Sequence, residues 1–329
     1  MQRISIGQVL TSVPHVTVAQ WRASSWLVRW LISARASVLV MSFASAAVGI
    51  LLAVRQPHFD AIAAFAATVG LLLAHAANNQ LNDLTDSVRG IDDGNYFRNR
   101  YGAHVLQDQL LTTRGLWGYI GVTAGVALAI GLWLVSRVGP TILLPLVAGS
   151  LFLLFYTWPL KQWGLGELAV LLVWGPLMVG GAYLAASGAW SWDAALIGTV
   201  YALGPTAVIF GKHIDKLEFD RTKRIATLPV RLGATQSRRW VRGMVALSYL
   251  GTFALIALGS LPWPVLLVAL ALPKAYRLDQ VYREPAPATC PSLFPPSAWP
   301  LWYVAFAFDH TRSFSLLFVA GLCVGRALA

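Results

Sequence analysis

The sequence predicts an all-α membrane protein, a bundle of about nine transmembrane helices with its polar residues gathered at one end. Of the 329 residues, 57% are hydrophobic and 12% are charged, and the mean hydropathy is +0.62. These values argue against an ordinary soluble enzyme. Apolar runs of about 20 residues recur, long enough to cross a hydrocarbon core in which only a helix satisfies its own backbone groups. The basic residues are also unevenly distributed between the connections.

The chain divides into a short N-terminal segment and one membrane domain. Residues 1–32 carry Arg3, Arg22 and Arg29 without a clean apolar core, so we expect an amphipathic cytoplasmic segment rather than a signal peptide. Residues 33–328 form the transmembrane domain. Its expected spans are 33–54, 60–81, 116–136, 140–158, 167–187, 193–211, 242–260, 261–275 and 312–328. A proline-rich loop precedes the last span.

The distribution of Lys and Arg predicts how these spans are oriented. Of the 25 basic residues, 22 fall on one side of the predicted bundle, and only Arg55, Arg137 and Arg326 fall on the other. Basic connections stay in the cytoplasm. We therefore expect a multi-pass protein of a bacterial inner membrane whose polar stretches face the cytoplasm. The net charge of +11 reflects this topology, and we expect no nucleic-acid partner.

The first polar stretch continues out of the second expected span. On a helix, Asn79, Asp83 and Asp86 share one face, and Asn82 lies one turn before Asp86. Such oxygen ligands suit Mg²⁺, which one or two carboxylates and substrate phosphates usually hold. A solvated helix end with capping carboxylates is the alternative, but carboxylates at a helix C-terminus oppose the macrodipole. The stretch predicts a magnesium site, and a polyphosphate is its natural guest.

The second polar stretch follows the sixth expected span and mixes acids with cations. Lys212, Lys216 and Asp220 share a helical face, whereas Asp215 and Asp220 diverge by about 140° on a regular helix. In one interpretation the acids hold metal while the cations contact phosphate oxygens. In the other, the stretch is a structural ion-pair network on a cytoplasmic helix.

The two stretches resemble the two Asp-rich motifs of the UbiA superfamily of intramembrane prenyltransferases. The first motif resembles that of the branch that prenylates 1,4-dihydroxy-2-naphthoate in menaquinone synthesis. It reads Asn79-x-x-Asn82-Asp83-x-x-Asp86-x-x-Arg89-Gly90-x-Asp92. The second runs from Asp215 through Asp220-Arg221 to Thr227-Leu228-Pro229-Val230-Arg231-Leu232-Gly233. A third similarity comprises Tyr156-Thr157-x-Pro159-Leu160, Gly164-Leu165-Gly166-Glu167 and Gly175-Pro176.

The chain departs from the family pattern in two places. Lys216 stands where the second motif has its first Asp, and Asp215 is displaced by one residue. We expect Asp215 and Asp220 to bind metal across an irregular helix. In the alternative, Lys216 contacts the diphosphate and Asp220 alone carries the metal. The Arg-x-Gly-Pro-x-Arg pattern of the naphthoate branch is also absent, and Arg98-Asn-Arg100-Tyr-Gly102-Ala-His104 stands in its place.

The resemblance implies nine helices around a central cavity capped by two cytoplasmic Asp-rich loops. It also implies a prenyltransferase of the class that transfers alkyl or aryl groups other than methyl, dependent on Mg²⁺. The prenyl group would pass from an allylic diphosphate to an aromatic acceptor in quinone synthesis, with 1,4-dihydroxy-2-naphthoate as the candidate, while the prenyl tail lies in a groove open to membrane lipid. The implied metal-binding and catalytic residues are Asp83, Asp86, Asp215 and Asp220. The implied substrate-binding residues are Asn79, Asn82, Arg89, Lys161, Lys212, Lys216, Arg221, Lys223 and Tyr156.

Two other functions compete with aromatic prenyl transfer. A terpene cyclase of the same fold would ionise a prenyl diphosphate with no acceptor, and product analysis without an aromatic compound distinguishes the two. A secondary transporter would gather its polar residues near the middle of the membrane, whereas here they lie at helix ends. We expect His75 and His213 to be structural, and Glu167 either to orient the acceptor or to cap a helix.

Overall fold

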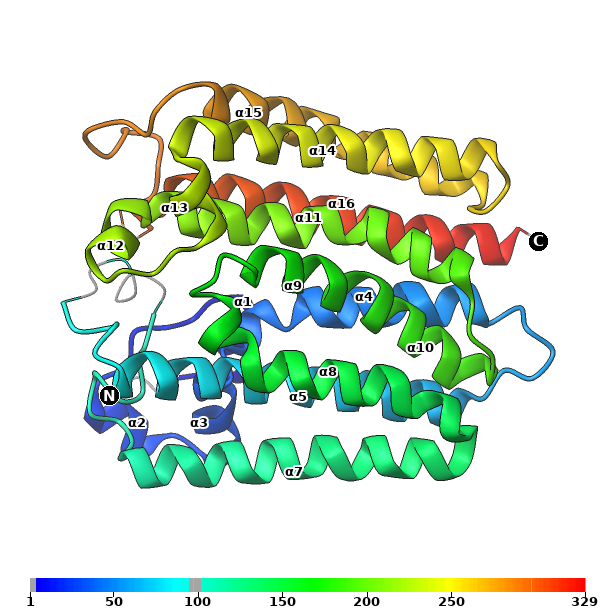
Figure 1. The fold of residues 1–329 in the computed structure, drawn as a ribbon, viewed down its shortest axis with the longest axis horizontal. Helices are drawn as coiled ribbons and strands as arrows, with labels where there is room; N and C mark the ends of the chain where they lie inside the picture. Colours follow the sequence, from blue (N-terminus) through cyan, green and yellow to red (C-terminus); the bar gives the residue numbers. More distant parts are fainter. Residues whose placement is uncertain (1–3, 95–96, 98–101, 297, 329) are drawn as a thin grey trace.

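The computed structural model describes residues 4–94, 97, 102–296 and 298–328, and every regular element in them is helical. The helices run side by side along the long axis of the molecule (Figure 1). Their bounds are α1 Ile6–Thr11, α2 Val18–Ala23, α3 Trp26–Ser33, η1 Ala36–Val38, α4 Val40–Ala53, α5 Ala61–Val88, α7 Thr113–Val138, η2 Pro140–Ile142, α8 Leu143–Phe155, η3 Tyr156–Leu160, α9 Gly166–Leu172, η4 Val173–Leu177, α10 Met178–Ser187, α11 Trp192–Asp215, α12 Leu217–Thr222, α13 Leu228–Leu232, α14 Ala234–Ala257, η5 Trp263–Ala271, α15 Leu272–Arg283 and α16 Trp302–Ala327.

Seven helical segments among the described residues are long and apolar enough to cross a membrane. They are Ala36–Ala53, Ala61–Val88, Thr113–Val138, Pro140–Leu160, Gly166–Ser187, Trp192–Asp215 and Ala234–Ala257. These segments correspond to the first seven expected spans. The last two expected spans are also helical, but polar residues such as Lys274 and Arg312 interrupt their apolar sequence. The count of nine spans therefore stays a prediction.

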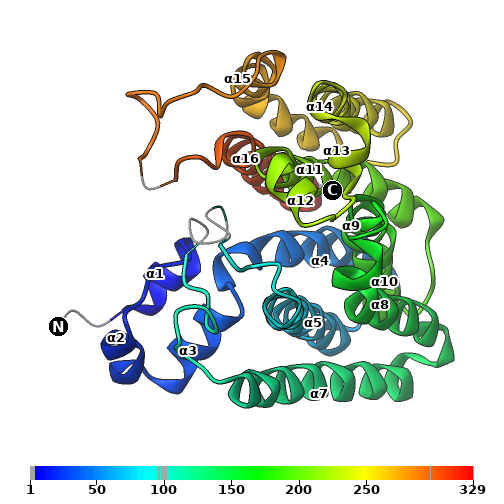
Figure 2. The same cartoon turned by 60° about the vertical axis from the view of Figure 1, so that its left-hand side comes forward.

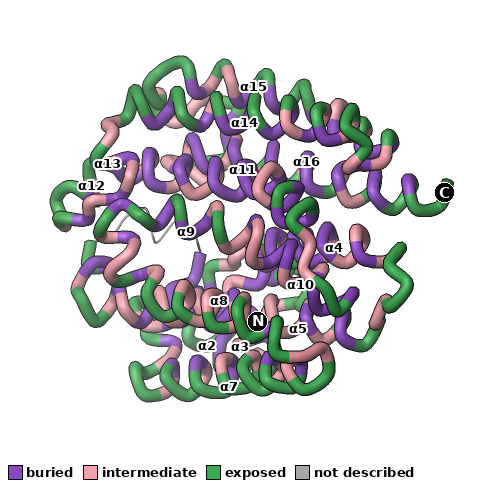
Figure 3. Tube along the Cα trace, turned by 45° about the vertical axis from the view of Figure 1, so that its right-hand side comes forward, coloured by how far each residue is buried: buried purple, intermediate pink, exposed green. Residues whose placement is uncertain are grey.

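The helices form a bundle in which α11 is the most enclosed of the candidate spans. It packs against α14, α16, α9 and α4, and 72% of its apolar window is buried. In contrast, only 11% of the window is buried in the Pro140–Leu160 segment. Figure 3 shows the same contrast between the interior and the outward surfaces of the peripheral helices. The exposed apolar surfaces of these outer helices are those that a hydrocarbon solvent would cover.

Helix α5 delivers the first polar stretch to one end of the bundle. Asp60 caps its start by accepting hydrogen bonds at 3.0 Å from the backbone N–H groups of Ile62 and Ala63. The helix has 28 residues, which corresponds to about 42 Å and exceeds the roughly 30 Å of a hydrocarbon core. Its last turns therefore extend beyond the apolar layer. Figure 2 shows α5 flanked by α4, α7 and α8, in agreement with their contacts.

The remaining polar segments meet α5 at this end. The end of α11, the short helices α12 and α13, and the N-terminal helices α1–α3 all lie at the same end of the bundle (Figure 1). The turn after η3 also reaches it. Within η3, Trp158 leaves helical geometry (φ −147°, ψ 128°) beside Pro159, which lacks a backbone N–H group. This break turns the chain from α8 into α9 next to the end of α5.

We expect Gly49→Ala to destabilise the bundle, because a Cβ atom there would lie 2.2 Å from the Val179 carbonyl oxygen of α10. Such overpacking costs about 1–3 kcal/mol. The matched control is Gly121→Ala on α7, where a Cβ atom would meet nothing within 4 Å. Because alanine favours the helix over glycine by about 1 kcal/mol, the control should not destabilise. Thermal unfolding in detergent measures both changes, and equal melting temperatures would contradict this packing.

Candidate functional site

The carboxylates of the first motif are buried and paired with cations from distant segments. Asp83 and Asp86 are only 2% and 6% exposed at the end of α5. Arg35 Nη2 contacts Asp83 Oδ1, and Lys161 Nζ donates to Asp86 Oδ2 at 2.7 Å. Burying a carboxylate costs several kcal/mol unless a partner charge and hydrogen bonds compensate. The two cations supply that compensation.

Arg35 is also part of this site. In the sequence it was only one of the 22 basic residues on the predicted cytoplasmic side. It lies between α3 and η1 with a left-handed backbone (φ 52°), a conformation uncommon outside glycine. Two side chains of α5 hold this turn: Asn79 Nδ2 donates to the Ala34 carbonyl and Gln80 Nε2 to Ser33 Oγ, both at 2.9 Å. They bring the guanidinium to Asp83. The available sequence signal was an Arg at the start of an apolar span.

Lys161 lies where the charges of both motifs act together. It follows η3 and is 4% exposed. Burial opposes its charged form, but the neighbouring Asp86 carboxylate outweighs burial and raises the pKa of Lys161. The charges of Asp220 and Asp92 act on the same ammonium group. Lys161 therefore stays protonated as a cation shared by the two motifs.

In the second motif, a break after α11 sends its two aspartates in different directions. Lys216 leaves helical geometry (φ −111°, ψ 19°) between α11 and α12. Its Nζ lies 2.9 Å from Oδ1 of Asp220, which is fully buried. Asp215 instead accepts hydrogen bonds from the backbone N–H groups of Tyr303 (2.8 Å) and Val304 (3.0 Å) at the start of α16. The irregularity that we expected is present, but it does not bring Asp215 to Asp220.

Several other predicted residues tie the two motifs to their surroundings. Lys223 Nζ donates to the Gly90 carbonyl at 2.8 Å and so bridges the second motif to the first. Asn82 Nδ2 donates to Thr157 Oγ1 at 3.2 Å, and the Arg89 guanidinium lies 4.8 Å from the Trp158 ring centroid.

The last three predicted residues differ in their relation to the cluster. Lys212 lies close enough to Arg35, Lys161 and Lys216 for their charges to act on it. The charges of Asp86 and Arg35 likewise act on Tyr156. Arg221 does not join them, because it pairs at 3.0 Å with the surface carboxylate of Glu218. We expected Arg221 to bind substrate, and in this structure its guanidinium contacts Glu218 at the surface.

Buried histidine–carboxylate pairs brace both polar segments. His213 Nδ1 lies 2.6 Å from Glu167 Oε1, and Glu167 Oε2 accepts from the backbone N–H of Leu228 at 3.4 Å. His104 Nε2 lies 2.8 Å from Asp92 Oδ2 in the loop after α5. Of the unusual stretch after the first motif, Arg98 and Arg100 lie outside the described residues. His75 contacts Ser42 Oγ at 2.8 Å, as expected of a structural histidine.

The donor set of the cluster suits a divalent cation, although its carboxylates do not converge. Among the described residues, no three acidic, histidine or cysteine side chains form a ready ligand group, and a cation accompanies each acid instead. Yet the buried atoms Asp86 Oδ1 and Asp220 Oδ2 have no hydrogen-bond partner among the described residues. Unpaired buried carboxylate oxygens are costly, and they are the ligands that Mg²⁺ prefers.

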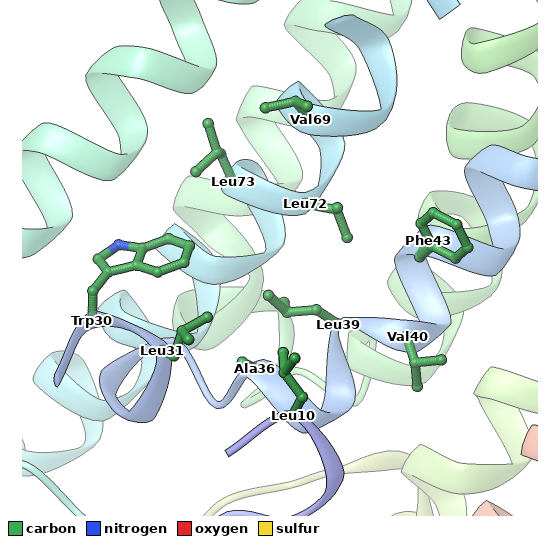
Figure 4. A pocket seen from close by; sticks show the side chains of 10 residues that line it. All are labelled: Leu10, Trp30, Leu31, Ala36, Leu39, Val40, Phe43, Val69, Leu72 and Leu73. Atoms are coloured by element: carbon green, nitrogen blue, oxygen red, sulfur yellow. The ribbon is translucent and has the colours of Figure 1, made fainter. Parts of the chain in front are cut away.

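An apolar pocket of about 400 Å³ lies between the N-terminal helices, η1, α4 and α5 (Figure 4). Its lining is Leu10, Trp30, Leu31, Ala36, Leu39, Val40, Phe43, Val69, Leu72 and Leu73. These residues come from the N-terminal helices, η1, α4 and α5. The pocket approaches the polar site at Ala36, which follows Arg35 in the chain, whereas Leu72 lies on the same face of α5 as Asp83 but about 16 Å before it along the helix. A charged end and a hydrocarbon surface thus meet at η1.

We expect Asp215→Ala to lower stability, since the Asp215 carboxylate serves two N–H groups at the start of α16. Loss of such a cap costs about 0.5–2 kcal/mol. The Mg²⁺ concentration required for activity should not change. Thermal unfolding and a Mg²⁺ titration of turnover measure the two effects. An unchanged melting temperature together with a raised Mg²⁺ requirement would instead indicate that Asp215 binds the metal.

Comparison with known proteins identifies the family of this chain. The sequence pattern described as the UbiA prenyltransferase family matches residues 42–304. The 1,4-dihydroxy-2-naphthoate octaprenyltransferase of Escherichia coli (strain K12) is 31% identical over 270 residues, which cover 78% of this chain and 86% of the relative. The 2-carboxy-1,4-naphthoquinone phytyltransferase of Synechocystis sp. is 28% identical over 232 residues, covering 68% of this chain and 71% of the relative.

The fold is similar to that of a UbiA homolog from Archaeoglobus fulgidus solved bound to DMAPP and Mg²⁺. The TM-score is 0.60 at 16% identity, with 91% of this chain and 99% of that chain covered. At this identity the likeness establishes the fold. The family match spans most of the chain and includes both polar motifs. With its membrane-length apolar helices, the protein is a multi-pass membrane prenyltransferase and belongs to the UbiA prenyltransferase family.

Proposed function

We propose that this prenyltransferase transfers a polyprenyl group from an allylic diphosphate to an aromatic acceptor of the 1,4-dihydroxy-2-naphthoate class. The observation that carries the proposal is the buried Lys161, on which the charges of Asp86 in the first motif and Asp220 in the second both act. A single polyanionic ligand at this point would contact both motifs. The naphthoate relatives support the acceptor, and the 22 basic residues predicted on one side support a cytoplasmic active site in a bacterial inner membrane.

Three cations would receive the diphosphate: the buried Lys161 and Lys216, and Arg35, whose side chain is 11% exposed. Arg35, Lys161 and Lys216 each contact one carboxylate. Phosphate oxygens bind such groups with charge-assisted hydrogen bonds. A cation that turns to phosphate releases carboxylate oxygens, and Asp86 and Asp220, with Asp83 beside them, would then hold Mg²⁺. Mg²⁺ bound there supplies charge neutralisation at the leaving oxygen.

The remaining chemistry follows from the charges around the leaving group. The allylic C–O bond breaks and its electron pair leaves with the diphosphate. The acceptor ring carbon then bonds to the allylic carbon and loses its proton to the released diphosphate. Tyr156 lies near Asp86, and its ring face would stabilise the allylic cation. Arg35, Lys161 and Lys216 offset the charge that develops on the diphosphate.

The apolar pocket beside Arg35 would take the start of the prenyl tail. Its lining residues are all hydrophobic, and the turn at the start of η1 places Arg35 next to Ala36 of the pocket wall. A diphosphate held by Arg35 would place its hydrocarbon chain against Leu72 and Phe43 (Figure 4). Because Phe43 is 52% exposed, a longer chain could continue into the lipid.

The direct test incubates the purified protein with Mg²⁺, prenyl diphosphates of several lengths and aromatic acids, followed by mass spectrometry. We expect a prenylated aromatic product that requires both substrates. A cyclic or linear terpene that forms equally without an aromatic compound would identify a terpene cyclase. Absence of any diphosphate release would reject both reactions.

We expect Asp83→Ala, Asp86→Ala and Asp220→Ala each to lower kcat/KM by at least about 100-fold, or roughly 3 kcal/mol, because each removes a carboxylate from the proposed metal site. Glu218→Ala is the matched control, since Glu218 lies on α12 two residues from Asp220 with its side chain 81% exposed. The control should keep near-normal activity. Near-normal turnover of any site variant at saturating Mg²⁺ would remove that residue from the site.

We expect Leu72→Trp to narrow the pocket and to act selectively on long substrates. Displacing two methylene groups from the pocket costs about 1.6 kcal/mol, or roughly a tenfold loss of kcat/KM for a polyprenyl diphosphate. The kcat/KM of the variant for dimethylallyl diphosphate should equal that of the wild type. Leu144→Trp on the outer surface of α8, where Leu144 is 77% exposed, is the control. Equal loss with short and long substrates would place the tail elsewhere.

A further inference from the structure

A further buried cation takes no part in the ion pairs of the two motifs and is only partly hydrogen-bonded. Arg238 is in the second turn of α14 and is only 8% exposed. Its Nε and Nη1 atoms are buried and have no hydrogen-bond partner among the described residues. Nη2 makes a long contact of 3.4 Å with Thr235 Oγ1, and the guanidinium is also hydrogen-bonded to the side chain of Tyr303. A buried guanidinium without an anion costs several kcal/mol.

The guanidinium is held against the N-terminal turn of α14. The contact with Thr235 directs it back toward the start of the helix, where Gly233 (φ +77°) provides no side-chain cap. The first turn also contains no acidic residue. The first N–H groups of a helix have no intrahelical partner and carry a partial positive charge. Arg238 and this helix end therefore place two positive features at one turn.

Nearby acids are already engaged and do not neutralise Arg238. Asp279 of α15 lies 2.5 Å from Arg242 Nε and 2.7 Å from Arg283 Nη2. Burial alone would raise the pKa of Asp279, but hydrogen bonds from these arginines outweigh it and hold the pKa below its ordinary value. The Asp215 carboxylate serves the backbone at the start of α16.

The surrounding groups match a phosphate-bearing ligand. The side chain of Tyr303 is beside Arg238, and its hydroxyl donates to the Glu284 carbonyl at 2.8 Å. The location is the polar end of the bundle, between the starts of α14 and α16. An arginine beside a helix N-terminus offers a planar set of donors together with backbone N–H groups, the combination that binds phosphate. Basic pockets between membrane helices bind phospholipid headgroups by the same chemistry.

We propose that Arg238 and the N-terminal turn of α14 form a phosphate-binding site separate from the site of prenyl transfer. The ligand is a phosphate group, carried either by an anionic phospholipid at the membrane surface or by free phosphate or diphosphate. This assignment does not depend on the reaction proposed above. It gives the protein a point at which the headgroup of an anionic phospholipid or released diphosphate can bind without entering the prenyl-transfer site.

The test compares Arg238→Gln with Arg239→Gln, which removes the same charge from an exposed neighbour on the same helix. Native mass spectrometry in neutral detergent measures phosphatidylglycerol binding against phosphatidylcholine, and calorimetry measures inorganic phosphate and diphosphate. Arg238→Gln should weaken binding at least about tenfold, the loss expected for charge-assisted hydrogen bonds. The control should retain wild-type affinity. Preference for phosphatidylglycerol identifies a lipid headgroup, and binding of the free anions identifies a soluble ligand.

Thr235→Glu keeps the test decisive if Arg238→Gln does not fold. A carboxylate in the first turn is favourable for the helix and should pair with Arg238, so this variant should be stable and should lose anion binding. Wild-type affinity in Thr235→Glu, or equal affinities in Arg238→Gln, Arg239→Gln and the wild type, would overturn the proposal.

Discussion

The neutralisation of buried carboxylates at one end of the bundle is the constraint on which the rest of the structure depends. Asp83, Asp86 and Asp220 are almost fully enclosed, and each has a cation brought by a different segment. Arg35 comes from the turn before α4, Lys161 from the break after α8, and Lys216 from the break after α11. Without these partners, burial would cost several kcal/mol per charge. The irregular backbone at these breaks thus brings each cation to its carboxylate.

The same charge balance would allow the proposed site to accept a diphosphate together with a metal ion. Each of the three carboxylates is paired with one cation. A diphosphate brings charges for the cations, and a divalent ion brings charge for the carboxylates. This exchange would keep the net charge of the enclosed site close to zero. Neither the carboxylates nor the cations would then be left without an opposite charge. Asp86 Oδ1 and Asp220 Oδ2, which lack hydrogen bonds among the described residues, are the atoms with the most to gain.

The sequence was sufficient for features that depend on local spacing and composition. Hydropathy indicated the all-helical membrane class and located seven of its spans, and the i, i+4, i+7 spacing placed Asp83 and Asp86 at the same end of α5. It was less informative where direction depends on distant contacts. Asp215 contacts backbone groups 88 and 89 residues away. Arg35 required a left-handed turn that the sequence did not signal.

The most direct measurement is a structure of the protein with Mn²⁺ and a thiolodiphosphate analogue of the prenyl substrate, with the metal located by its anomalous scattering. We expect the metal at ligand distance, about 2.2 Å, from oxygen atoms of Asp86 and Asp220. Lys216 Nζ should have moved from Asp220 to the diphosphate. A metal bound by Asp215, or a diphosphate bound while Arg35, Lys161 and Lys216 all keep their carboxylate partners, would contradict the exchange of charges between protein and ligand.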